Sequence, residues 1–107
     1  RGGSGAGGGM SEAKPAYWIA HVTVKDADAY ARYAALATEA IVAHGGEFLA
    51  RGGRYTQFEG TDRPRHVVAR FPSMAAAEAC YRSDTYRAAL SHAKGAAERD
   101  LVIVEGA

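Results

Sequence analysis

The chain has 107 residues, of which 48% are hydrophobic and 23% are charged, and its formal net charge at pH 7 is +1. Acidic and basic side chains are interspersed, so the sequence lacks the basic stripe that general nucleic-acid binders carry. No apolar run approaches the roughly 20 residues that a membrane-spanning helix needs. The single cysteine, Cys80, cannot form an internal disulfide. We therefore expect a cytoplasmic protein that binds neither nucleic acid nor membrane.

Residues 1–9 read RGGSGAGGG and precede Met10. Glycine and serine at that density cannot bury apolar surface, so this stretch is expected to be a flexible linker left over from protein expression. A phosphate-binding glycine loop would need a strand before it and a helix after it, and the neighbouring sequence offers neither. Residues 10–107 are expected to form a single domain.

Residues 17–24 (YWIAHVTV) are rich in aromatic and β-branched side chains, which predicts a strand. One of its faces is wholly apolar and the other mostly so, which favours a strand covered on both sides. A helix is expected next, capped by Asp26 or Asp28 and ended at Gly45 and Gly46. Its inward positions, at helical spacing, are expected to be Tyr30, Tyr33, Ala34, Ala37 and Ile41.

Residues 47–59 can form two short strands joined by a tight turn at Gly52 and Gly53, or one long strand bent there by a bulge. The bent strand is favoured, because the flanking pieces are short and a second turn, at residues 60–64, follows at once. Residues 66–71 (HVVARF) then predict another strand.

Two helical segments follow, and Ser73 and Ser83 are expected to cap them. The side chains expected to face inward are Met74, Ala77 and Tyr81 in the first segment and Tyr86, Leu90 and Ala93 in the second. Residues 101–104 (LVIV) predict the last strand.

The predicted order is therefore β-α-β-β-α-β, with a helical extension before the last strand. Two crossovers around a central hairpin give the ferredoxin-like α+β fold, in which helices cover one face of a four-stranded antiparallel sheet. The other face would expose apolar side chains from every strand, and an exposed apolar face of that size usually marks an interface. We therefore expect a homodimer that forms through the sheet faces.

The segments that carry a family resemblance are AYWIAHVTVKD, the spaced Tyr30 and Tyr33, HGGEFLARGG, Glu59-Gly60, RHVVARFPSMAAAEACYRSDTYRAAL and LVIVEG. Together they resemble the domain of unknown function 1330 family, over about residues 15–106. The resemblance implies a dimeric α/β barrel, in which two ferredoxin-like protomers pack their sheets together, and it implies no established activity. Members often have tryptophan at the position of Cys80, so a pocket lined there would differ in size or polarity.

Proteins that share this superfamily fold include cofactor-free monooxygenases, muconolactone isomerases, haem proteins related to chlorite dismutase, and stress-responsive dimeric barrels. A shared fold is poor evidence for a shared reaction, so none of these activities transfers to this chain without a matching site.

The candidate catalytic residues are His21 and Arg51. If the polar members of the strands share one face, these two side chains converge there with either His66 or Arg70. An interior guanidinium needs an anion, and its planar fork fits a carboxylate through two hydrogen bonds. That anion is either a substrate or a glutamate of the chain itself, Glu47 or Glu59.

His21 could move a proton, because free histidine titrates at about pH 6.5, or it could be an ordinary core or interface histidine. The candidate ligand-binding residues are Tyr17, Arg51, Glu59, Tyr81 and Tyr86. The tyrosines could line a pocket for a flat organic ligand, although aromatic residues at such spacing are more often core. No residues stand at metal-ligand spacing, and neither a metal nor another cofactor is expected.

Two functions remain open from the sequence. The first is a cofactor-free enzyme that isomerises, opens or oxygenates a small acidic or aromatic metabolite, with Arg51 holding an oxygen anion and His21 moving a proton. The second is a non-catalytic dimer that binds a ligand or serves as a stress or interaction module.

Overall fold

The computed structural model describes residues 14–107, so the predicted linker and Met10 lie outside the described residues. The elements in chain order are β2 (Ala16–Val24), α1 (Ala27–Ala43), β3 (Glu47–Arg51), β4 (Arg65–Phe71), α2 (Met74–Arg82), α3 (Asp84–Ala93) and β5 (Ala97–Glu105). None of these helices is long and apolar enough to cross a membrane.

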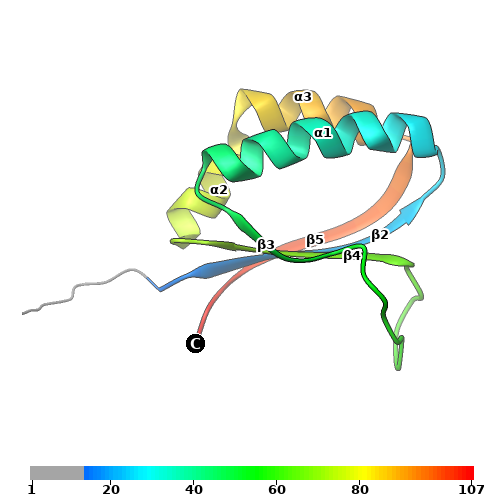
Figure 1. Ribbon diagram of the computed structural model, residues 1–107, viewed down its shortest axis with the longest axis horizontal. Helices are drawn as coiled ribbons and strands as arrows, with labels where there is room; N and C mark the ends of the chain where they lie inside the picture. The colour runs from blue at the N-terminus through cyan, green and yellow to red at the C-terminus, as the bar shows by residue number, and fades with distance from the viewer. Residues whose placement is uncertain (1–13) are drawn as a thin grey trace, which may run out of the picture.

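The four strands form one sheet in the order β3-β4-β2-β5, and every neighbouring pair is antiparallel. All three helices lie on the same face of this sheet (Figure 1). The arrangement confirms the predicted ferredoxin-like α+β fold. Strand β5 is longer than predicted, because it pairs with β2 along the whole of that strand, from Ala16 opposite Glu105 to Val24 opposite Ala97.

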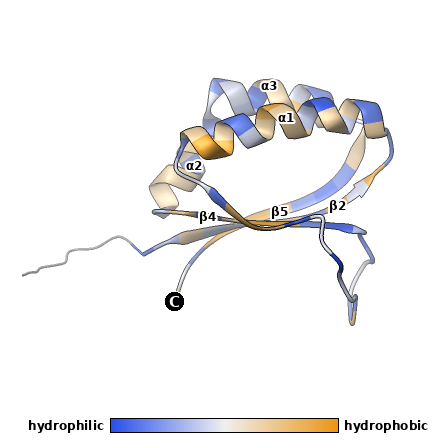
Figure 2. Cartoon of the chain, in the orientation of Figure 1, coloured by the Kyte–Doolittle hydropathy of each residue, from blue (hydrophilic) through white to orange (hydrophobic). Residues whose placement is uncertain are grey.

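The core lies between the helices and the sheet. Trp18 is 1% exposed, and its indole packs edge-on to the ring of Tyr86, with 5.1 Å between centroids, and lies 5.6 Å from that of Phe71. Burying each of these large side chains contributes about 1.5–3 kcal/mol. Hydrophobic residues accordingly gather along the middle of the sheet beneath the helices (Figure 2).

The opposite face of the sheet carries no helix (Figure 1). We call it the open face; its side chains include Tyr17, Ile19 and His21 from β2, which alternate with the buried Trp18 and Ala20. His21 is exposed, so the prediction that β2 is covered on both sides is wrong within one protomer.

The helix caps were largely predictable. The Asp26 carboxylate, rather than that of Asp28, accepts from the backbone N–H of Ala29 (3.2 Å). Ser73 caps α2, and Ser83 caps α3 by accepting from the N–H of Tyr86 (3.2 Å). The residues buried on α1, α2 and α3 are Tyr30, Tyr33, Ala37, Ala40, Ile41, Ala77, Cys80, Tyr86, Ala89 and Ala93.

Tyr81 packs against the core as expected, but it is less buried than its neighbours on α2. Helix α2 turns Ala77 and Cys80 toward the core, and both are fully buried, whereas Tyr81 is 40% exposed. Tyr81 lies on the same helix face as Ala77, four residues earlier, and its ring covers the edge of the core, with centroids 6.0 Å from Trp18 and 5.2 Å from Tyr86.

The long bent strand predicted for residues 47–59 is also wrong. Strand β3 ends at Arg51, and residues 52–64 form a loop that leaves the sheet on the side away from the helices (Figure 1). The N–H of Gly52 makes one further bond, to the carbonyl of His66 (2.9 Å). Because β4 begins only at Arg65, it offers residues 55–59 no backbone to pair with. These residues therefore remain in the loop despite their high strand propensity.

We predict that Gly46→Ala lowers the free energy of unfolding by about 1–3 kcal/mol, because it overfills the junction between α1 and β3. A Cβ at Gly46 would lie 2.5 Å from Cγ2 of Ile41 and 2.9 Å from Cζ of Phe71. Urea denaturation measures the change. Gly53→Ala is the matched control, since nothing lies within 4 Å of a Cβ there. Equal effects of the two substitutions would contradict the packing described.

Candidate functional site

A pocket lies between α1 and the helix-facing side of the sheet, and we call it the α1 pocket. Its apolar lining includes Trp18, Ala20 and Val67. Its polar lining includes the side chains of Tyr30, Tyr33, Thr38, Arg51, Arg65 and Arg99. The cavity measures about 30 Å³, which is room for about two water molecules. Only a small group, such as the carboxylate of a larger ligand, fits without movement of the walls.

The three guanidinium groups of the α1 pocket rest on aromatic side chains. Cζ of Arg51 lies 4.3 Å from the ring centroid of Phe48. The corresponding distance is 5.5 Å from Arg65 to Tyr30 and 4.6 Å from Arg99 to Tyr33. Each cation therefore faces the electron-rich surface of a ring, which holds the guanidinium in place without neutralising its charge.

No carboxylate of residues 14–107 pairs with these three arginines. The ion pairs in this part of the chain use Lys25, Arg63, Arg70 and Arg82 instead. The Nε atoms of Arg65 and Arg99 are buried and have no hydrogen-bond partner among the described residues. A buried donor or charge without a partner is costly, so the pocket favours an anion that would supply the missing acceptors.

Two buried tyrosines hold Arg99. Its Nη2 donates to the hydroxyl oxygens of Tyr33 (2.6 Å) and Tyr86 (3.0 Å), which are themselves 2.7 Å apart. Burial raises the pKa of both hydroxyls, that of Tyr33 far above its ordinary value, so both stay protonated at neutral pH. The Tyr33–Tyr86 bond uses one of the two hydroxyl protons. The other is available to a further acceptor, and Tyr33 is the member of the pair that lines the pocket.

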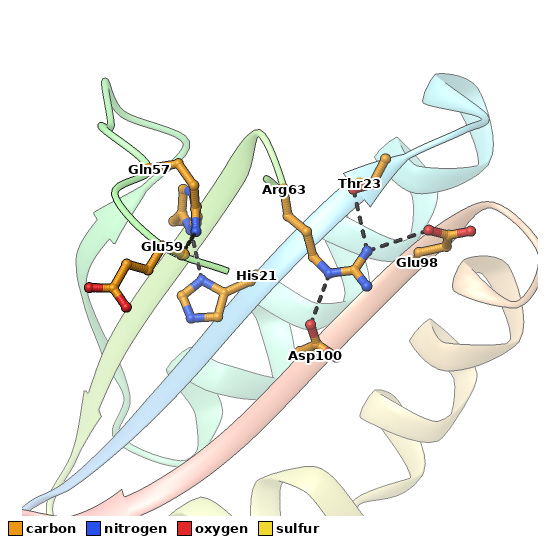
Figure 3. A network of polar contacts seen from close by, with 8 residues as sticks. His21, Thr23, Gln57, Glu59, Arg63, Glu98 and Asp100 are labelled. Atoms are coloured by element: carbon orange, nitrogen blue, oxygen red, sulfur yellow. Dashed lines mark hydrogen bonds and ion pairs between the residues drawn. The ribbon is translucent and has the colours of Figure 1, made fainter. Parts of the chain in front are cut away.

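A second hollow, of about 290 Å³, lies on the open face beneath the loop 52–64 (Figure 3). At its floor Nδ1 of His21 and Nδ1 of His66 are 2.7 Å apart, so one of these nitrogens donates a hydrogen bond to the other. Arg63 reaches across β2 to Asp100, with 2.9 Å between its Nε and the Asp100 Oδ2 (Figure 3). Tyr55 packs against the other side of His66, with 4.7 Å between ring centroids.

The family model for Domain of unknown function (DUF1330) matches residues 15–107 of this chain. The protein belongs to the DUF1330 family. Among curated proteins, no match is found.

Solved structures resemble the DUF1330 chain at low sequence identity, which shows the fold alone. The methylated RPA0582 protein of Rhodopseudomonas palustris is 21% identical, with a TM-score of 0.72, over 89% of this chain and 82% of that one. SnoaB of Streptomyces nogalater, a cofactor-independent oxygenase, is 11% identical, with a TM-score of 0.62, over 88% and 94%. A dimeric ferredoxin-like protein of unknown function from Thermobifida fusca is 17% identical, with a TM-score of 0.59, over 88% and 92%.

The two candidate catalytic residues of the DUF1330 chain do not meet. His21 and His66 come together as expected, but Arg51 lines the α1 pocket on the opposite face. The cause is a bulge between Phe48 and Ala50, after which Arg51 pairs with Val67 rather than with His66. One extra residue in a strand exchanges the two faces for every residue that follows it.

The remaining predicted residues are dispersed over the DUF1330 fold. Tyr17 lies half-buried on the open face, and Tyr81 is half-exposed at the edge of the core. Glu59 is in the loop 52–64 and lines the second hollow together with His21. Tyr86 is fully buried and reaches the α1 pocket only through Arg99 and Tyr33. Arg70, the alternative partner of His21, lies on the open face 3.8 Å from Glu47. Residues 14–107 contain no cluster of three metal-ligating side chains.

Sequence reasoning missed Arg65 and Arg99 as site residues. Arg99 alternates along β5 with Ala97, Leu101 and Ile103, whose side chains face the helices. A charged residue at an inward position of a strand is a signal of a functional site. The signal was hidden because the predicted strand began only at residue 101.

We predict that the stability of the DUF1330 protein falls as the pH rises above about 10, where tyrosines of the unfolded chain ionise. The pKa of Tyr33 is raised in the folded state, because its hydroxyl is buried. At alkaline pH, unfolding therefore releases a proton that the folded state holds, and a rise in pH favours the unfolded chain. Tyr33→Phe should reduce this dependence, measured as the slope of unfolding free energy against pH from 9 to 11.5.

The control for that slope is Ser91→Ala, which changes an exposed helix position without removing a titrating group. It should keep the wild-type slope. Identical slopes for wild type and Tyr33→Phe would contradict the buried, protonated Tyr33.

Proposed function

We propose that this DUF1330 protein binds a small organic anion in the α1 pocket and acts on it as a cofactor-free enzyme. The observation that supports this most directly is the set of three guanidiniums, of Arg51, Arg65 and Arg99, that have no carboxylate partner in the described chain. Guanidinium forks are the preferred protein partners of carboxylates.

The α1 pocket is equipped to stabilise negative charge rather than to remove a proton. Its ionisable lining in residues 14–107 consists of arginines and tyrosines, without a carboxylate, imidazole or thiol. Guanidiniums and the Tyr33 hydroxyl would lower the free energy of an oxygen anion that forms on the ligand. Such a pocket suits a substrate whose proton is acidic enough to pass to a water molecule, which leaves the negative charge on the ligand's oxygen. Isomerisation, lactone opening and oxygenation can each pass through an oxygen anion of that kind.

The alternative function is binding without catalysis, and the positions of the histidines favour it. His21 and His66 are the histidines of the sheet, and both lie on the open face, away from the α1 pocket. If the ligand needs a base from the protein, the α1 pocket alone does not provide one, and the protein would be a binding module.

We predict that oxalate or pyruvate at low ionic strength raises the melting temperature of the wild-type protein. A ligand at 100 times its dissociation constant stabilises the folded state by about 2.7 kcal/mol. Arg65→Met and Arg99→Met should each weaken binding at least tenfold, measured by isothermal titration calorimetry. Stabilisation of the wild type by neither anion would contradict the proposed ligand class.

Two substitutions serve as controls. Arg87→Met removes an exposed arginine of α3, and His21→Ala changes the open face, so both should leave anion binding unchanged. Enzyme and binding module are separated by NMR of bound pyruvate in D₂O. Faster deuterium exchange at the pyruvate methyl group with wild type than with Arg99→Met favours the enzyme, whereas binding without exchange favours the module.

We also propose that the protein is a homodimer, in which the open faces of two copies pack together. Large apolar side chains remain exposed on this face, among them Val102 (52%) and Val104 (47%) of β5. A single ferredoxin-like protomer covers only one side of its sheet, and a contiguous apolar surface is the usual mark of an interface.

A further inference from the structure

The loop 52–64 presents an aromatic side chain to solvent. Phe58 is 90% exposed, more than any other large hydrophobic residue in the described chain. The loop that carries it projects from the sheet on the same side as the open face (Figure 1). Connections of this length without secondary structure are uncommon in a small domain and are usually functional.

Phe58 is exposed although the loop around it is held in place. At its C-terminal end, Arg63 bonds to Asp100 of β5 and, more weakly, to Thr23 of β2 (3.4 Å) (Figure 3). Across the loop, the hydroxyl of Tyr55 donates to Oδ1 of Asp62 (2.8 Å). A loop tied at several points has little freedom to fold its phenyl ring back against its own protomer.

The same face also offers a hollow of matching chemistry. It measures about 90 Å³, and Ile19, Leu101 and Val102 supply its apolar walls. His21 and Asp100 form the rest of its lining, next to the residues that anchor the loop. The projecting ring and the apolar hollow thus belong to one side of one chain.

We propose that Phe58 of each copy packs into the Ile19–Val102 hollow of a second copy, so that the loop 52–64 is the arm that clasps the dimer. A twofold interface brings the same patch of both subunits together, so a projection and a hollow on one patch satisfy each other twice. Arg63 is paired with Asp100 and Arg70 with Glu47 on this face, so these arginines do not call for an acidic partner in place of a second copy. The inference rests on the proposed dimer and adds its anchoring residue.

Sedimentation equilibrium of Phe58→Ser tests the arm. The substitution should raise the dissociation constant of the dimer at least tenfold, because it removes a central aromatic anchor. Val42→Ser is the matched control; Val42 is 60% exposed on α1, on the other side of the sheet, and its replacement should leave the constant unchanged.

Disulfide trapping locates the contact. A mixture of Phe58→Cys and Val102→Cys proteins should form a crosslinked heterodimer on mild oxidation, whereas Phe58→Cys with Val42→Cys should not. The native Cys80 is fully buried and does not interfere.

The results separate the two proposals. If Phe58→Ser dimerises as strongly as the wild type and the Phe58–Val102 crosslink does not form, the proposed arm is wrong and the proposed dimer stands. A wild type that stays monomeric at micromolar concentration overturns both.

Discussion

Strand β2 lies in the middle of the sheet, hydrogen-bonded to β4 on one side and to β5 on the other, and the placement of every functional side chain depends on its alternation. Trp18 and Ala20 face the helices and fix which side of each neighbouring strand is buried. His21, next in sequence, must then face away. The covered side thereby receives Arg65 and Arg99, and the open side receives the histidine pair and the exposed Val102 and Val104.

Arg99 joins the core to the α1 pocket. Its guanidinium donates to the hydroxyls of Tyr33 on α1 and Tyr86 on α3. One side chain of β5 therefore ties the sheet to two helices. Hydrogen bonds to a charged group contribute about 1.5–3 kcal/mol, which offsets part of the cost of burying the cation. The Nε, without a partner in the described chain, carries the remaining cost, which the proposed anion would relieve. If the proposed anion binds there, ligand binding and folding stability would be coupled at this residue.

The sequence was sufficient to predict the order of the elements, the capping residues and the fold, because these follow from local patterns of polar and apolar residues. It was insufficient at β3, where a bulge between Phe48 and Ala50 moves Arg51 to the helix-facing side. Without that bulge Arg51 would stand opposite His66, as the predicted convergence of His21 and Arg51 requires. A bulge depends on how two strands pair, so no single segment encodes it. The missed role of Arg99 has the same origin, since it required the full pairing of β5 with β2.

Strand β4 connects the proposed anion site with the proposed dimer interface. Arg65 faces the α1 pocket and His66, the next residue, faces the open side with His21. Packing of a second copy on the open face would act directly on His66 and on the loop 52–64 that precedes it. Because a strand moves as a unit, any shift of β4 in the dimer also moves the Arg65 guanidinium on the other side. The proposed dimer interface and the proposed anion site are thus linked by two consecutive residues of β4, although they lie on opposite faces of the sheet.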